Sequence, residues 1–289
     1  MCPTVERPPC FTDNMSQYSN PLELDVMKSI MLGVVILTSV IPCAWANSPA
    51  DYEKQLMLRL VADRSPGGAV WLGSGRNTFL SLYREATDLN SKNAAIILHS
   101  MGMHADWPDL ISPLRKHLPE TGWTSLSVQL PVLSPEIGIA EYGGTFIQAN
   151  RRIRMAVRYL LDKDYSNIVF IGVGFGATTA VQYLTTSGSA VKALVGISMH
   201  NHDFLKPKYN LVENLSDIKQ PVLDIYAGQD GSAVMDSIYD RRLAGSNKEN
   251  KSYDQKVIQY ASQYFPGKET ELVNEIVRWL DNWFSENEI

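Results

Sequence analysis

Six short, continuous apolar runs recur from residue 94 onward, and longer segments with helical periodicity separate them. The runs cover residues 94–98, 124–130, 167–171, 193–198, 221–226 and 256–260. Continuous apolar runs of this length are typical of strands buried on both faces. In the final segment, apolar residues at steps of three and four predict an amphipathic helix: Leu272, Val273, Ile276, Val277, Leu280 and Phe284. The alternation predicts an α/β fold with a mostly parallel central sheet and helices on both faces.

An N-terminal β-hairpin is expected before this sheet. Apolar runs at 69–72 and 78–83 flank the glycine-rich stretch 73–77, a pattern that predicts two antiparallel strands and a turn. A helix is predicted over 52–62. Another is predicted over 145–162, with its apolar side formed by Ile153, Val157, Leu160 and Leu161.

The first 46 residues are predicted to be a polar lead and a secretory signal peptide. Residues 30–41 form an uncharged apolar run, shorter than the roughly 20 residues that cross a bilayer. Lys28 precedes the run, and Ala44-Trp45-Ala46 follows it as a cleavage site with small outer residues. We therefore expect translation from Met27, cleavage after Ala46, and one periplasmic domain over residues 47–289.

Two alternatives for this segment keep the chain at the membrane. An uncleaved signal would anchor it, and Cys43 could imitate a lipoprotein cleavage box, although Pro42 stands where such a box needs a small residue. Cys2, Cys10 and Cys43 are the only cysteines, and all three lie in the segment expected to be removed, so no disulfide is expected in the mature chain. Removal of the apolar run 30–41 also leaves no expected transmembrane helix. The net charge of −5 provides no broad basic surface for nucleic acid.

A glycine-rich turn after the 167–171 run is the sharpest local motif. Gly172, Gly174 and Ala177 satisfy a dinucleotide-binding fingerprint, which normally opens the first strand-helix-strand unit of its sheet. Here at least three predicted strands come first, so no nucleotide or other cofactor is expected. The same turn has the flanks of a nucleophile elbow, Gly-x-Ser-x-Gly, with Gly174 at its centre instead of serine.

Three sequence stretches carry a resemblance to a known family. They are His99-Ser-Met-Gly-Met-His-Ala-Asp-Trp-Pro108, Gly122-Trp-Thr-Ser-Leu-Ser-Val-Gln-Leu-Pro131, and Phe265-Pro-Gly267 with Val277-Arg-Trp-Leu280. They resemble a bacterial family of exported α/β-hydrolase-like proteins classed among domains of unknown function. The resemblance covers roughly residues 56–284 and implies the α/β-hydrolase fold and export, with little about substrate.

The hydrolase roles implied by this resemblance fall on residues that cannot all perform them. Asp230 matches the triad acid, Gly174 occupies the nucleophile position, and Gln263 occupies the histidine position. No histidine follows His202, so the usual chain order of the triad cannot be completed. The backbone amides of Phe175 and of a residue near Met101 would still form an oxyanion-hole-like pair.

These residues predict a non-catalytic domain of the cell envelope. We expect it to bind a small anionic or acyl ligand in the former active-site cleft, or an envelope protein through the loop 132–144. The alternative is an esterase or acyl hydrolase with a displaced nucleophile, Ser100 or Ser198, served by a nearby histidine.

Four histidines follow the ends of predicted strands, and we expect them on the rim of the cleft. They are His99, His104, His200 and His202. With Asp106, Asp203 or Asp230 they could form a zinc site, but their spacing matches no metal signature. No bound metal is expected.

Overall fold

The structure, a computed structural model, describes residues 49–62, 68–187, 190–246 and 252–287. The predicted signal peptide, residues 1–46, lies outside the described residues. Residues Asn47–Ile289 form one compact unit. The strands are β1 (Gly68–Leu72), β2 (Phe79–Arg84), β3 (Asn93–Leu98), β4 (Thr124–Val128), β5 (Asn167–Val173), β6 (Val191–Ile197), β7 (Val222–Gln229) and β8 (Tyr253–Ser262).

The described helices are interspersed with the strands along the chain, and α2 precedes β1. The α-helices are α2 (Pro49–Ala62), α3 (Ile111–His117), α4 (Phe146–Leu161), α5 (Phe175–Ser187), α6 (Leu211–Leu215), α7 (Ser232–Asp236), α8 (Ile238–Gly245) and α9 (Glu269–Asn287). Three 3-10 helices are η1 (Gly75–Asn77), η2 (Leu118–Thr121) and η3 (Ile139–Thr145). None of these helices combines the length and apolar character that crossing a bilayer requires.

The strands form one eight-stranded sheet in the order β1-β2-β4-β3-β5-β6-β7-β8. β1 pairs with β2, and β2 with β4, in antiparallel fashion, whereas the other neighbouring strands run parallel. The parallel strands therefore end at the same edge of the sheet, where α/β folds place their sites. The predicted α/β architecture with a mostly parallel sheet is confirmed.

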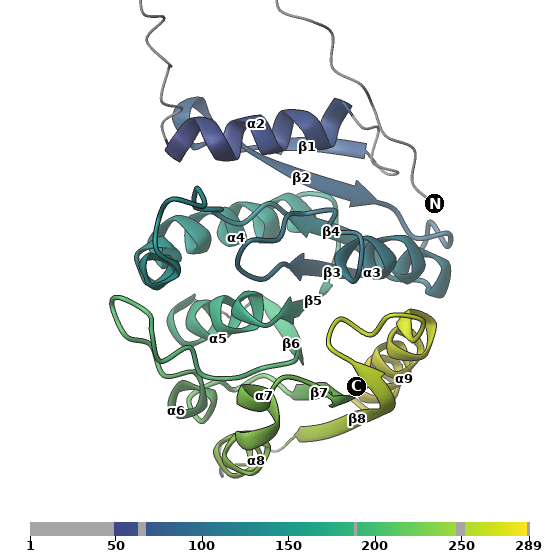
Figure 1. The fold of residues 1–289 in the computed structure, drawn as a ribbon. Helices are drawn as coiled ribbons and strands as arrows, with labels where there is room; N and C mark the ends of the chain where they lie inside the picture. Colours follow the sequence, from purple (N-terminus) through teal and green to yellow (C-terminus); the bar gives the residue numbers. More distant parts are fainter. Residues whose placement is uncertain (1–48, 63–67, 188–189, 247–251, 288–289) are drawn as a thin grey trace, which may run out of the picture. The chain divides into compact units, whose positions relative to one another are not determined.

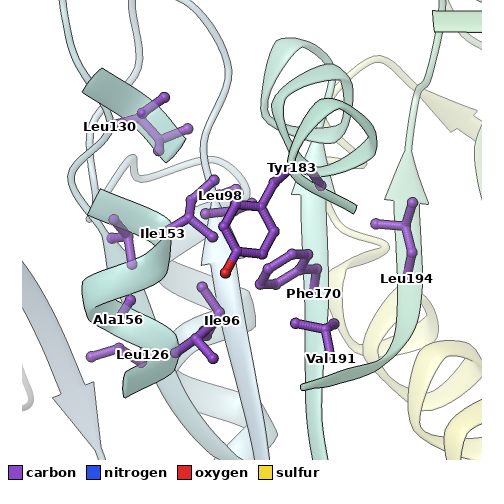
Figure 2. Packing of buried hydrophobic residues seen from close by; sticks show 14 of the residues in the cluster. Ile96, Leu98, Leu126, Leu130, Ile153, Ala156, Phe170, Tyr183, Val191 and Leu194 are labelled. Carbon is purple, nitrogen blue, oxygen red and sulfur yellow. The ribbon is translucent and has the colours of Figure 1, made fainter. Parts of the chain in front are cut away.

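Apolar side chains alternate between the two faces of the sheet. Ile96, Phe170 and Leu194 pack against α4 and α5, as Figure 2 shows with Ile153 and Tyr183. On the opposite face, a second core holds Ile97, Ile171 and Val195 from the sheet, with side chains of α3 and α9. Figure 1 shows α4, α5 and α6 on one side of the sheet and α3 and α9 on the other. Both faces are covered, which explains the continuous apolar runs.

Two details of the sequence prediction are corrected by the structure. The run 124–130 predicted a longer strand, but β4 ends at Val128. Leu161, expected on the apolar side of α4, is 41% exposed, whereas Ile153 and Leu160 are fully buried. Leu161 is the last residue of α4, so its side chain lies at the end of the helix and beyond the packed stripe.

A buried ion pair joins the N-terminal helix to the segment that leaves β4. The guanidinium of Arg152 in α4 contacts both carboxylate oxygens of Glu53 in α2 and donates to the carbonyl oxygen of Gln129 at 2.8 Å. Both charged side chains are largely buried. Removal of either partner would leave an uncompensated buried charge, which is strongly destabilising. The pair therefore fixes the start of the loop that covers the candidate site.

Candidate functional site

The turn between β5 and α5 has the backbone form of a nucleophile elbow. Its central residue, Gly174, has a φ of +50°, in the left-handed region that glycine adopts without the strain of a Cβ atom. The Gly174 amide donates to the carbonyl oxygen of Ile197 at 2.9 Å, which ties the turn to the end of β6. α5 starts at the next residue, Phe175, so the turn lies at a helix N-terminus.

The hydroxyl of Ser100 occupies the space that a side chain at Gly174 would need. A Cβ atom built on Gly174 would lie 2.7 Å from Ser100 Oγ and 3.4 Å from Ser100 Cβ. The same Ser100 Oγ accepts a hydrogen bond from the Phe175 amide at 3.1 Å. One of the two amides expected to form the oxyanion-hole-like pair is therefore bound to a side chain of the protein itself.

A tyrosine from the 132–144 segment covers the second expected donor region. Tyr142, in η3, accepts hydrogen bonds from the amides of Gly102 and Leu133, both at 3.2 Å. Its ring packs edge-on against Phe175 with the centroids 5.6 Å apart. Met101, the predicted donor, is half-buried beside these rings. Tyr142 was not among the predicted site residues, although it is the one aromatic residue of the loop 132–144.

A small apolar cluster closes over the turn. It consists of Tyr142, Phe146, Phe175 and Leu205, and the Phe146 ring stacks on Phe175 at 5.3 Å. Two surface hollows of the described chain lie elsewhere. One, of about 470 Å³, lies between α6 and α8, and the other, of about 260 Å³, lies between β8 and α9. The turn is thus packed over by side chains.

Asp230, the expected acid, follows β7 and is bound to a serine. Its Oδ2 accepts from Ser198 Oγ at 2.6 Å and from the Ala227 amide at 3.2 Å, and its Oδ1 accepts from the Gly231 amide at 2.9 Å. Ser198 follows β6 and has a φ of +54°. The structure thus brings together Ser198 and Asp230, two candidate residues that the sequence alone does not connect.

Gln263 lies in the turn after β8 with an exposed side chain. This place, at the C-terminal edge of the last strand, is where the resemblance puts the triad histidine. Within the described ranges, no hydrogen bond joins Gln263 to Asp230 or to Ser100. The three expected triad positions therefore share one edge of the sheet without a hydrogen-bonded connection among them.

The structure places two of the four expected rim histidines in the interior. His99 is 2% exposed, and its ring nitrogens face the Ser100 carbonyl oxygen at 2.8 Å and the Leu130 amide at 3.0 Å. Burial lowers the pKa of His99 to about 4, so its ring is neutral near pH 7. With both nitrogens engaged by backbone groups, His99 holds two loops together and has no free nitrogen for a nucleophile.

His202 is also 2% exposed, with its Nδ1 3.3 Å from Thr178 Oγ1. Burial and the neighbouring His200 ring, 4.2 Å away between centroids, lower the pKa of His202 to about 3. The half-buried His200 contacts the Ser198 carbonyl oxygen through Nδ1 at 3.1 Å. The backbone of Ser198, and not its hydroxyl, is therefore the partner of His200.

His104 is half-buried. Its Nδ1 accepts from the Asp106 amide at 3.2 Å, and its ring contacts Trp107. Burial lowers the pKa of His104. In the part of the chain that the structure describes, no group of three or more His, Cys, Asp or Glu side chains is arranged to hold a metal.

Comparison with known sequences identifies the family. A family model described as a protein of unknown function, DUF3530, matches residues 44–140 and 145–282. The chain belongs to the DUF3530 family. Among curated proteins, no sequence matches this DUF3530 chain.

Solved structures show what the DUF3530 fold is similar to. Est1E from Butyrivibrio proteoclasticus has a TM-score of 0.61 at 13% identity and covers 76% of this chain and 100% of its own. An esterase from Pyrococcus furiosus has a TM-score of 0.61 at 14% identity, with coverages of 77% and 95%. A dienelactone hydrolase from Anabaena variabilis has a TM-score of 0.59 at 18% identity, with coverages of 74% and 96%. The predicted α/β-hydrolase fold is confirmed.

The first prediction concerns the contact between Gly174 and Ser100. We expect Gly174→Ala to lower the free energy of unfolding by about 2–3 kcal/mol, because its Cβ is strained at positive φ and meets the Ser100 hydroxyl. In a Ser100→Ala background the loss should shrink by about 1 kcal/mol, measured by a urea double-mutant cycle. Gly138→Ala is the control, since a Cβ there meets nothing within 4 Å. Additive losses would contradict the contact.

The second prediction concerns acid stability. Because the folded-state pKa values of His99 and His202 lie far below the ordinary 6.5, the unfolded chain binds protons that the folded chain does not. The free energy of unfolding should therefore fall from pH 6.5 toward pH 4, by about 3 kcal/mol for His99 alone. Urea unfolding of His202→Gln should show a smaller pH dependence, while the exposed His117→Gln should keep the wild-type dependence. Equal slopes in all three proteins would refute this assignment.

Proposed function

We propose that this DUF3530 protein is a non-catalytic binding domain of the cell envelope, built on the α/β-hydrolase fold. One observation carries the proposal: Ser100 Oγ occupies the nucleophile's space beside Gly174 and accepts from the Phe175 amide. An oxyanion hole works when its donors point at the place where negative charge develops. Here the donor already has a hydroxyl partner.

The geometry of the remaining polar groups agrees with a lack of turnover. A serine hydroxyl becomes an effective nucleophile when an adjacent base accepts its proton. Ser198 donates to the Asp230 carboxylate rather than to a histidine, and His99 and His200 contact backbone carbonyl oxygens. Loss of a triad costs about 10⁶ in rate, so a typical turnover of about 10 per second would fall to about 10⁻⁵ per second.

The ligand class follows from the groups at the turn. A carboxylate or acyl oxygen could replace Ser100 Oγ as the acceptor of the Phe175 amide, at the positive end of the α5 dipole. A ligand there must also displace part of the cluster around Tyr142. If the cluster stays closed, an envelope protein could instead contact the 132–144 segment, where Ile139 is 56% exposed.

A second candidate, an acyl hydrolase with a displaced nucleophile, has one specific observation in its favour. Ser198 has a left-handed φ of +54° and lies 2.6 Å from Asp230, so it resembles a residue held in a strained turn beside an acid. The Pyrococcus furiosus esterase among the similar folds makes acyl esters the substrates to test. One experiment distinguishes the binding domain from the acyl hydrolase.

We expect the purified protein to show no hydrolysis of a panel of activated esters above the rate without protein. Because no hydrogen bond among the described residues joins a histidine to either hydroxyl, Ser100→Ala and Ser198→Ala should not change the measured rate. Gly174→Ser alone should also stay inactive, while Gly174→Ser combined with Gln263→His and Ser100→Ala restores the three residue types without the Ser100 clash. Ester hydrolysis by the wild type that Ser100→Ala or Ser198→Ala abolishes would overturn the binding-domain proposal in favour of the hydrolase.

Export is part of the same proposal. The signal-like pattern ends at Ala46, and the compact unit Asn47–Ile289 begins at the next residue. Removal of residues 1–46 would therefore leave the whole compact unit. In a bacterial host with an active secretion pathway, we expect the periplasmic fraction to contain a chain that starts at Asn47, as measured by intact mass. Ala46→Arg, which disrupts the small-residue site, should prevent this cleavage; a cytosolic chain of unchanged mass would refute export.

A further inference from the structure

The C-terminal end of β8 and the turn that follows it present aromatic and amide side chains to solvent. Tyr260 is 86% exposed and Tyr264 is 36% exposed, and Gln259, Ser262 and Gln263 are exposed as well. We call these five residues the tyrosine rim. No charged residue occurs between Lys256 and Lys268, although 20% of the chain is charged.

The backbone of the tyrosine rim has an unusual conformation. Tyr260, Tyr264 and Phe265 have φ values of +58°, +68° and +58°. A bulky residue with positive φ is an outlier that costs free energy. Phe265 is fully buried in the core, which offsets its cost, but the side chain of Tyr260 gains almost no burial. A glycine or asparagine would suit position 260 better if the fold alone determined the residue.

The tyrosine rim lies beside the loop of the expected acid. Ser262 is paired in register with Gln229, the last residue of β7 and the neighbour of Asp230. A Cβ atom built at Gly228 would lie 3.4 Å from the Tyr260 nitrogen, so the two backbones are in close contact there. The rim is therefore at the C-terminal edge of the sheet, where α/β folds bind ligands.

The chemistry of the rim fits a neutral, hydroxyl-rich ligand. The face of an aromatic ring is negatively polarised, and it attracts the positively polarised C–H bonds of a sugar ring. Glutamine amides and a serine hydroxyl both donate and accept hydrogen bonds, as sugar hydroxyls do. The lack of charge gives no attraction for a nucleic acid or an anionic membrane surface.

A protein partner is the main competing occupant. The centres of protein interfaces are fully desolvated and enriched in aromatic side chains, tyrosine included, and in arginine, so the tyrosines alone fit either occupant and their polar neighbours decide. On the rim, polar Gln259, Ser262 and Gln263 alternate with the tyrosines, while the apolar Ala261 and Phe265 are buried. A sugar chain needs such alternation of ring faces and hydrogen-bonding groups.

We propose that the tyrosine rim is a binding site for a neutral glycan chain, in which Tyr260 and Tyr264 stack on sugar rings and Gln259, Ser262 and Gln263 bind their hydroxyls. This site does not depend on whether the Gly174 turn binds a ligand. It uses different side chains from the proposed anionic or acyl site.

The test uses the protein as its host produces and processes it. It is titrated with cello-, malto-, xylo- and N-acetylglucosamine tetramers, and binding is measured by calorimetry and ligand-observed NMR. We expect at least one tetramer to bind with a Kd of about 1 mM or tighter. Tyr260→Ala and Tyr264→Ala should each weaken that binding about tenfold, a loss of about 1.4 kcal/mol. Tyr239→Ala is the matched control, because Tyr239 is 72% exposed on α8, and it should bind like the wild type.

Tyr260→Gly separates binding from folding. Glycine adopts positive φ without a Cβ penalty, so this variant should keep or raise the melting temperature while it weakens glycan binding. A variant that loses both stability and binding would assign Tyr260 a structural role and overturn the proposal. The proposal is also overturned if none of the four tetramers binds, if Tyr239→Ala weakens binding as much as Tyr260→Ala, or if the tyrosine variants lose only binding to a purified protein partner.

Discussion

The close approach of α5 to the sheet is the constraint on which the whole site depends. A Cβ atom at Gly176 would lie 2.1 Å from the Leu98 carbonyl oxygen, and one at Gly172 would lie 2.5 Å from Ala177 Cα. Only glycine at these positions lets the helix start directly over the ends of β3 and β5. This packing places the Phe175 amide next to the loop after β3, where Ser100 is the residue within reach.

Once the turn is held in this way, its amide and the amides of the loops after β3 and β4 need acceptors. A buried amide without a hydrogen bond costs free energy comparable to a lost bond, whether or not the turn carries a nucleophile. Ser100 Oγ satisfies the Phe175 amide, and the Tyr142 hydroxyl satisfies those of Gly102 and Leu133. The fold therefore keeps the backbone of a hydrolase elbow and satisfies it with its own hydroxyls. Such a turn can be stable without a catalytic nucleophile at its centre.

The sequence predicts the parts of this arrangement that depend on local pattern. Continuous apolar runs locate β3 to β8, the stripe from Leu272 to Phe284 locates α9, and the glycine spacing locates the turn at Gly174. It does not predict that Ser100 lies against Gly174, because these residues are far apart in the chain and meet only through the sheet order. The burial of His99 and His202 also cannot be predicted from the sequence, because a polar side chain after a strand can point either into the protein or toward solvent.

At the C-terminal edge of the sheet, the end of each strand from β5 to β7 contacts the end of the next one. The Gly174 amide contacts Ile197 at the end of β6, the next residue Ser198 contacts Asp230 after β7, and Gln229 is paired with Ser262 at the end of β8. In a triad hydrolase the acid must remain available to a histidine, and the nucleophile to its base. Here each of these groups is engaged by a neighbouring loop, so the edge is held as one connected surface. A connected surface can bind a ligand without the proton transfers that turnover requires, which is the property that the proposed binding role needs.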